Sequence, residues 1–76
     1  MTTQELGAYL KARRIAMGIS IYRIMKDSGL SQKTTYRIER GNAAYAITSL
    51  LLYCDVLGLD IDFVEKNYKQ EQEVQS

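Results

Sequence analysis

Residues 31–42, SQKTTYRIERGN, contain the side chains of this chain that are best suited to form hydrogen bonds from a single surface. If the stretch forms a helix, a rotation of about 100° per residue places its long polar side chains on less than half of the circumference. Such side chains donate and accept hydrogen bonds, as do the base edges in the DNA major groove, which is wide enough for one helix. An ordinary solvated helix face is the alternative interpretation. The outward residues would be Gln32, Lys33, Tyr36, Arg37 and Arg40.

The opposite side of the same helix would be a narrow stripe of small residues, because it holds Thr34, Thr35 and Ile38. A helix with such a stripe can stand out from the domain that carries it. Ser31 is a favourable N-cap. The backbone N–H groups and the dipole at the start of the helix favour phosphate. We therefore expect this helix to present its polar side to a partner.

The elements that must position this helix are short helices themselves, since no stretch alternates apolar and polar residues for long enough to form a strand. Ser20 is placed to cap a second helix that ends at Gly29, and Thr2 or Thr3 is placed to cap the first. Two short helices joined through a glycine form a helix-turn-helix, because glycine easily adopts the backbone conformation of the tight turn. Asp60 would cap a fifth helix. We expect helices over residues 4–17, 21–27, 32–40, 45–57 and 61–68.

The composition fits one small domain, with 76 residues, 46% apolar residues and no proline. The net charge is only +1, but it is unevenly distributed. Residues 1–42 carry eight basic and three acidic side chains, a balance of +5, and residues 43–76 carry a balance of −4. A domain with this asymmetry can hold a polyanion on one side and keep its other side free. An ordinary solvated surface with uneven charge is the other interpretation.

We do not expect an enzyme, because the chain has no histidine, a single cysteine and no glycine-rich phosphate loop. The acidic residues lack metal-ligand spacing, so we expect no metal, no cofactor and no small-molecule ligand. Cys54 lies in an apolar helical run and is expected to be a small buried hydrophobe. The longest apolar run, residues 50–54, is far shorter than the ~20 residues of a membrane span. Because the start, MTTQEL, has no secretory pattern, these features predict a cytoplasmic protein with no membrane segment.

The apolar residues and several short motifs of the chain together form one pattern along most of its length. The residues that carry it are Leu6, Leu10, Arg14, the run MGIS at 17–20, Ile24, the run GLS at 29–31, Thr34, the run RIERG at 37–41, Ile47, Leu50, Leu51, Leu57, Gly58 and Asp60. Over residues 6–64 this pattern resembles the phage-repressor and Cro-like helix-turn-helix domains, the XRE family. The resemblance implies an all-α, five-helix, lambda-repressor-like domain over residues 1–68. The polar residues 69–76 are expected to form a disordered tail.

By this resemblance, the third helix is the recognition helix. Its base contacts would come from Gln32, Lys33, Tyr36 and Arg37. Phosphate contacts would come from the start of the second helix and from the loop after the third, at Ser20, Tyr22, Arg23, Arg40 and Asn42.

The resemblance also implies an ion pair between Arg14 and Glu39, which would orient the third helix against the first. The net contribution of such a pair to stability can be close to zero. The chain departs from the family at Ile21, where glutamine is common and contacts a phosphate. Tyr22 is therefore expected to supply that contact instead.

A candidate dimer contact consists of Leu52, Phe63, Val64 and Tyr68. Burial of these side chains against the first helix is the alternative. A dimer would bind palindromic half-sites about 34 Å apart. We expect a homodimeric, sequence-specific regulator of transcription, a repressor, that inserts the third helix into the major groove of double-stranded DNA. The alternative is a protein-interaction module on the same fold, binding a toxin or a polymerase subunit, which the low net charge and Ile21 favour.

Overall fold

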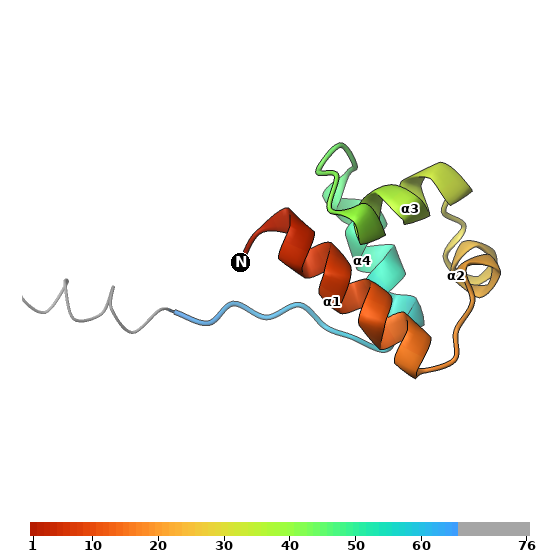
Figure 1. Ribbon diagram of the computed structural model, residues 1–76, viewed down its shortest axis with the longest axis horizontal. Helices are drawn as coiled ribbons and strands as arrows, with labels where there is room; N and C mark the ends of the chain where they lie inside the picture. The colour runs from red at the N-terminus through yellow and green to blue at the C-terminus, as the bar shows by residue number, and fades with distance from the viewer. Residues whose placement is uncertain (66–76) are drawn as a thin grey trace, which may run out of the picture.

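The computed structural model describes residues 1–65, which form four helices and no strand (Figure 1). The predicted all-α class is therefore confirmed for this part of the chain. The third helix has the predicted bounds, and the other three agree to within two residues. The predicted boundary between a domain over residues 1–68 and a tail over residues 69–76 lies outside the described residues, as does Tyr68. The helices are α1 (Thr3–Ala16), α2 (Ile21–Ser28), α3 (Gln32–Arg40) and α4 (Ile47–Val56).

The fifth helix, predicted over residues 61–68, is not found in the described part of the chain. Residues 61–65 have no regular secondary structure, and the rest of the range lies outside the described residues, so the five-helix count is not confirmed. The carboxylate of Asp62 accepts a hydrogen bond from the backbone N–H of Phe63 (2.9 Å), and such local bonds compete with helix formation. A short helix also needs an apolar face to pack, whereas Phe63 and Val64 are 94% and 85% exposed.

Side-chain caps set the start of the first two helices. In α1 the hydroxyl of Thr2 accepts a hydrogen bond from the N–H of Glu5 (3.0 Å), and the Glu5 carboxylate accepts one from the N–H of Thr2 (2.7 Å). In α2 the hydroxyl of Ser20 accepts one from the N–H of Arg23 (3.0 Å). The helix then ends at Gly29, whose φ of +79° lies in the left-handed region that glycine tolerates. This turn leads directly into α3 and completes the helix-turn-helix.

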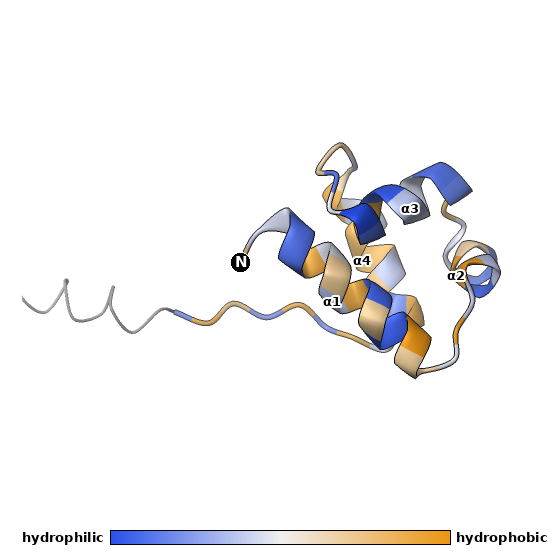
Figure 2. Ribbon diagram, in the orientation of Figure 1, coloured by the Kyte–Doolittle hydropathy of each residue, from blue (hydrophilic) through white to orange (hydrophobic). Residues whose placement is uncertain are grey.

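One apolar core joins the four helices, and each helix contributes to it. Figure 2 shows the contrast between the mostly hydrophobic α4 and the mostly hydrophilic α3. Ile38 is the one aliphatic side chain that α3 adds. Cys54 is buried, as the sequence predicts, and burial raises the pKa of its thiol. The core side chains are Leu10, Ile24, Ile38, Leu50, Tyr53, Cys54 and Leu57.

The backbones of α1 and α3 approach closely at Gly7. A Cβ atom at Gly7 would lie 2.5 Å from the carbonyl oxygen of Ile38 and 2.7 Å from that of Glu39. A Cβ atom at Gly41, which ends α3, would lie 2.6 Å from the Cα of Gln4. Side chains at either glycine would separate the two helices, so this contact holds the C-terminal end of α3 against α1. The sequence by itself indicates no role for Gly7.

Candidate nucleic-acid interface

The polar arc predicted on α3 faces away from the core. Thr35, Ile38 and Glu39 are buried, on the side that packs against the other helices. Four of the five side chains predicted to point outward are exposed, and Arg37 is half-buried. In Figure 1, α3 and the loop after it form the upper edge of the helical body, and residues 58–65, which follow α4, leave the body on its lower side. The exposed members of the arc are Gln32, Lys33, Tyr36 and Arg40.

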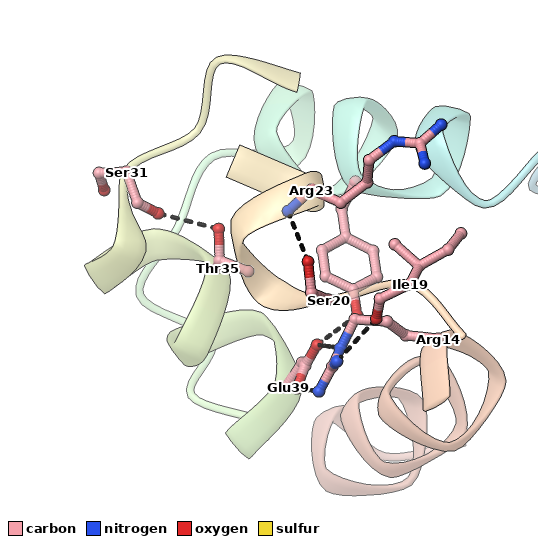
Figure 3. Close-up of polar contacts among 8 residues, drawn as sticks. Arg14, Ile19, Ser20, Arg23, Ser31, Thr35 and Glu39 are labelled. Carbon is pink, nitrogen blue, oxygen red and sulfur yellow. Dashed lines mark hydrogen bonds and ion pairs between the residues drawn. The ribbon is translucent and has the colours of Figure 1, made fainter. Parts of the chain in front are cut away.

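The first turn of α3 is anchored by hydroxyl groups. The hydroxyl of Ser31 accepts a hydrogen bond from the N–H of Thr34 (3.1 Å), and it contacts the Thr34 hydroxyl at 3.1 Å. The buried hydroxyl of Thr35 donates to the backbone carbonyl of Ser31 (2.9 Å; Figure 3). Gln32 and Lys33 project from this fixed turn, and their side chains make no hydrogen bond to other described residues. They are therefore free to contact a partner.

Arg37 and Asn42 brace the loop that follows α3. The guanidinium of Arg37 donates to the carbonyl oxygen of Ala44 (3.3 Å), and the side-chain carbonyl of Asn42 accepts a hydrogen bond from the N–H of Ala44 (3.0 Å). These contacts hold the loop beside the end of α3. A base contact by Arg37 would have to share the guanidinium with this loop or release it, which the sequence did not indicate.

Arg40 lies against Tyr36 one turn earlier on the same helix. Its guanidinium is 5.8 Å from the centre of the Tyr36 ring, and its Nε donates to the Tyr36 carbonyl oxygen (3.4 Å). A cation over an aromatic face is attracted to it, but only weakly where both are exposed to solvent. The pair presents one positive group and one phenol on the outward side of α3.

The start of α2 brings together the remaining residues predicted to contact phosphate. Tyr22 is 70% exposed. Ser20 uses its hydroxyl oxygen as the helix cap, so its O–H hydrogen is still available to a partner. Arg23 donates through its Nε to the carboxylate of Asp27 (2.7 Å). Exposed pairs of this kind are worth little, so Arg23 can exchange Asp27 for a phosphate at small cost.

Arg14 and Glu39 form the ion pair that the family resemblance implies. The Nε of Arg14 lies 2.6 Å from one carboxylate oxygen of Glu39, and its Nη2 donates to the other at 3.2 Å. The remaining Nη1 donates to the carbonyl oxygen of Ile19 in the loop between α1 and α2 (2.9 Å; Figure 3). Only 11% of the Arg14 side chain and 3% of the Glu39 side chain are exposed. The side-chain hydrogen bonds to Glu39 raise the pKa of the Arg14 guanidinium.

Tyr53 of α4 adds a third member to this pair. Its hydroxyl donates to the same carboxylate oxygen of Glu39 that the Nε of Arg14 contacts. The Tyr53 side chain is fully buried, and burial, followed by the contact with Glu39, raises the pKa of its phenol. From the sequence, Tyr53 is predicted to be a packing or rim residue, with no partner indicated for its hydroxyl. The available signal was chemical: a tyrosine on the core face of a helix needs a partner for its hydroxyl.

The charges around α3 are arranged to leave its outer surface positive. The segment 20–44 contains five basic side chains and two acidic ones, Asp27 and Glu39. Both carboxylates are paired with an arginine, and Glu39 is buried as well. Within residues 1–65, no group of three or more histidine, cysteine, aspartate or glutamate side chains is placed to hold a metal ion. The basic side chains of the segment are Arg23, Lys26, Lys33, Arg37 and Arg40.

Three of the four residues of the candidate dimer contact lie in the described part of the chain, and all three are exposed there. Leu52 on α4 is 43% exposed, and Phe63 and Val64 are almost fully exposed. In the single chain α1 does not bury them. Among residues 1–65, no helix combines the length and the apolar character needed to cross a bilayer.

A short helix, a tight glycine turn and a second helix with an exposed basic face together define a helix-turn-helix protein. The chain belongs to the Cro/C1-type HTH DNA-binding domain family, which matches it over residues 9–62. The resemblance described from the sequence is therefore confirmed, and so is membership of a DNA-binding family. A search of curated proteins found no match to this chain.

Proposed function

We propose that this protein is a sequence-specific regulator of transcription that inserts α3 into the major groove of double-stranded DNA and acts as a repressor. The observation that supports this best is the exposed arc of α3, which carries polar and basic side chains and no aliphatic one. A helix of nine residues with such a face matches the width of the groove and the donors and acceptors on its base edges. Occupying a site near a promoter blocks other proteins without further contacts, so repression is the outcome that binding alone supplies.

We assign the contacts of this interface to two groups. Gln32 and Lys33 lie at the start of α3, where side chains are free to reach bases, and Tyr36 and Arg37 lie one turn further on. We assign the phosphate contacts to two groups of exposed residues, one around the start of α2 and one around the end of α3: Ser20, Tyr22, Arg23, Arg40 and Asn42. Phosphate contacts supply affinity and register, and base contacts supply sequence preference.

We further propose that the protein binds as a homodimer through Leu52, Phe63 and Val64. These apolar side chains are exposed in the single chain, and contact with a second copy would remove them from water. A dimer with two-fold symmetry recognises a palindromic site. Selection of bound duplexes from a random DNA pool tests function and symmetry together. Enrichment of a palindrome with half-sites one helical turn apart is the expected result, and a pool that stays random would contradict sequence-specific binding.

The assignment of base contacts is tested with Lys33→Ala and with Lys11→Ala as the control. Both variants remove one exposed lysine, but Lys11 lies on α1, outside the proposed interface. We expect Lys33→Ala to relax preference at one position of the selected site, at a cost of about 1–3 kcal/mol. We expect Lys11→Ala to leave the preferred sequence unchanged. An equal loss on every variant of the site in Lys33→Ala would show that Lys33 contacts phosphate.

A protein-interaction module is the second candidate, because exposed apolar side chains on α4 and in the segment after it also suit a protein partner. The two functions differ in their response to salt. Binding to DNA releases counterions, so affinity for a random duplex must fall steeply as salt concentration rises. Absence of binding to any duplex at low salt would favour the protein partner.

A further inference from the structure

The carboxylate of Glu39 is held from two sides in the interior of the domain. Arg14 of α1 contacts both of its oxygens, and the hydroxyl of Tyr53 of α4 donates to one of them. Arg14 also donates to the carbonyl oxygen of Ile19, in the loop that leads to Ser20 and α2. One buried carboxylate on α3 therefore connects this helix directly to α1 and α4, and through Arg14 to the loop before α2.

We propose that Tyr53 is a positioning residue for DNA recognition, whose hydroxyl holds Glu39 so that α3 keeps the one rotation that aims its outward side chains at the bases. The proposal rests on the function proposed above. Tyr53 does not contact DNA in this scheme, because it is fully buried. It acts through Glu39, on the buried side of the recognition helix.

The small buried surface of α3 explains why a hydroxyl matters there. α3 inserts one aliphatic side chain, Ile38, into the core, and its other buried side chains are Thr35 and Glu39. Apolar contact is not directional, so a narrow apolar stripe restrains the rotation of a helix weakly. Hydrogen bonds are directional, and those that involve an ionised group are the stronger ones. The bonds to Glu39 from α1 and α4 supply the restraint that Ile38 alone does not.

Base contacts and phosphate contacts should respond differently when this restraint is removed. A bidentate base contact needs the correct donor geometry, whereas neutralising a phosphate depends mainly on charge. A small rotation of α3 therefore weakens binding to the preferred sequence more than binding to random DNA. A purely structural role would lower both affinities by the same factor, through the fraction of folded protein.

The test uses Tyr53→Phe, which removes the hydroxyl and keeps the ring, and Tyr9→Phe as the matched control. Tyr9 is an exposed tyrosine on α1 whose hydroxyl makes no hydrogen bond to described residues. Affinities for the selected duplex and for a random duplex are measured at several salt concentrations, below the unfolding temperature of each protein. We expect Tyr53→Phe to lower the ratio of the two affinities about 5- to 10-fold, with an unchanged salt slope. Tyr9→Phe should leave the ratio unchanged.

An unchanged ratio in folded Tyr53→Phe, or an equal loss of both affinities, would overturn the proposal. If Tyr53→Phe does not fold, Arg14→Lys serves instead, since lysine keeps the positive charge beside Glu39 but lacks the planar, rigid guanidinium that pairs with both of its oxygens. This variant should lower the same ratio, and an unchanged ratio would again overturn the proposal.

Failure of the proposed function gives a different result. If the wild-type protein binds no duplex at any salt concentration, the regulator assignment fails, and positioning is then judged from hydrogen exchange. The backbone amides of α3 should exchange faster in Tyr53→Phe than in Tyr9→Phe, relative to the amides of α1. Equal protection of α3 in the two variants would show that the Tyr53 hydroxyl does not restrain this helix.

Discussion

The close contact between α1 and α3 predicts that Gly7→Ala destabilises the protein. In most helix interiors this substitution is favourable, because alanine is about 1 kcal/mol better than glycine in a helix. Gly7 is an exception because its α-carbon faces the backbone of α3. An added Cβ would lie 2.5, 2.7 and 2.8 Å from the carbonyl oxygens of Ile38 and Glu39 and the nitrogen of Gly41.

The size of the effect follows from those distances. Carbon normally contacts such atoms at about 3.5 Å, so α1 and α3 would have to separate by roughly 0.5–1 Å. All three atoms belong to the backbone, and none can turn away as a side chain can. Overpacking of this kind costs about 1–3 kcal/mol, and sometimes more. Because three backbone atoms are approached at once, we take the upper part of that range, about 2–3 kcal/mol. After the gain of about 1 kcal/mol in helix propensity, we expect Gly7→Ala to lower the free energy of unfolding by about 1–2 kcal/mol.

Urea denaturation followed by circular dichroism measures this change, since small single domains usually unfold in one transition. Ala12→Gly is the control, because Ala12 is exposed on the same helix and the exchange involves the same two residue types in reverse. We expect Ala12→Gly to cost about 1 kcal/mol. The protein would then be less stable with alanine than with glycine at position 7, and more stable with alanine than with glycine at position 12. A Gly7→Ala protein as stable as the wild type would refute the argument for the contact.

Two further predictions concern the cap of α3 and the buried tyrosine. Ser31→Ala removes the acceptor for the N–H of Thr34 and should lower the free energy of unfolding by about 1 kcal/mol; an unchanged urea midpoint would contradict this. Burial and the contact with Glu39 raise the pKa of the Tyr53 phenol in the folded protein. The protonated phenol therefore contributes fully to the free energy of unfolding below pH ~10, the ordinary tyrosine pKa. That contribution is lost as the pH rises further, because the unfolded chain then releases the phenol proton while the folded protein keeps it. Stability of the wild type should therefore fall above pH ~10 more steeply than that of Tyr53→Phe, and parallel curves would contradict it. Tyr45 and Cys54, whose pKa values are also raised, are present in both proteins.

Local signals in the sequence were sufficient to predict the two ends of α3 and its exposed face. Ser31 and Gly41 mark the ends of the helix by their chemistry alone, and the structure places its cap and its left-handed residue there. The helical rotation then decides which side chains share a face. For the same reason the exposed arc followed from residue types and spacing without any knowledge of the neighbouring helices.

Features that depend on contacts between distant residues were not predictable in this way. The fifth helix had a suitable cap in Asp60, but within residues 61–65 the chain has no packed apolar face and no regular structure. The role of Gly7 depends on how closely two helices approach, and the contact from Arg37 to Ala44 depends on the path of a loop. Tyr53 is an intermediate case. A packed position for its ring could be predicted from the apolar run of α4, but its hydrogen-bond partner Glu39 could not.

The fold satisfies two opposing demands on α3. To reach DNA, the helix must expose most of its side chains, which leaves it with little apolar surface for the core. Its orientation must nevertheless be fixed, and the structure fixes it with contacts on its buried side: Glu39 held by Arg14 and Tyr53, and the backbone held at Gly7. None of these contacts involves the exposed residues Gln32 and Lys33. Exposed side chains without such contacts usually change stability by less than about 0.5 kcal/mol when substituted. In the proposed function, the sequence preference can therefore change at those positions without loss of the fold, whereas Arg37, which also contacts the loop after α3, does not have that freedom.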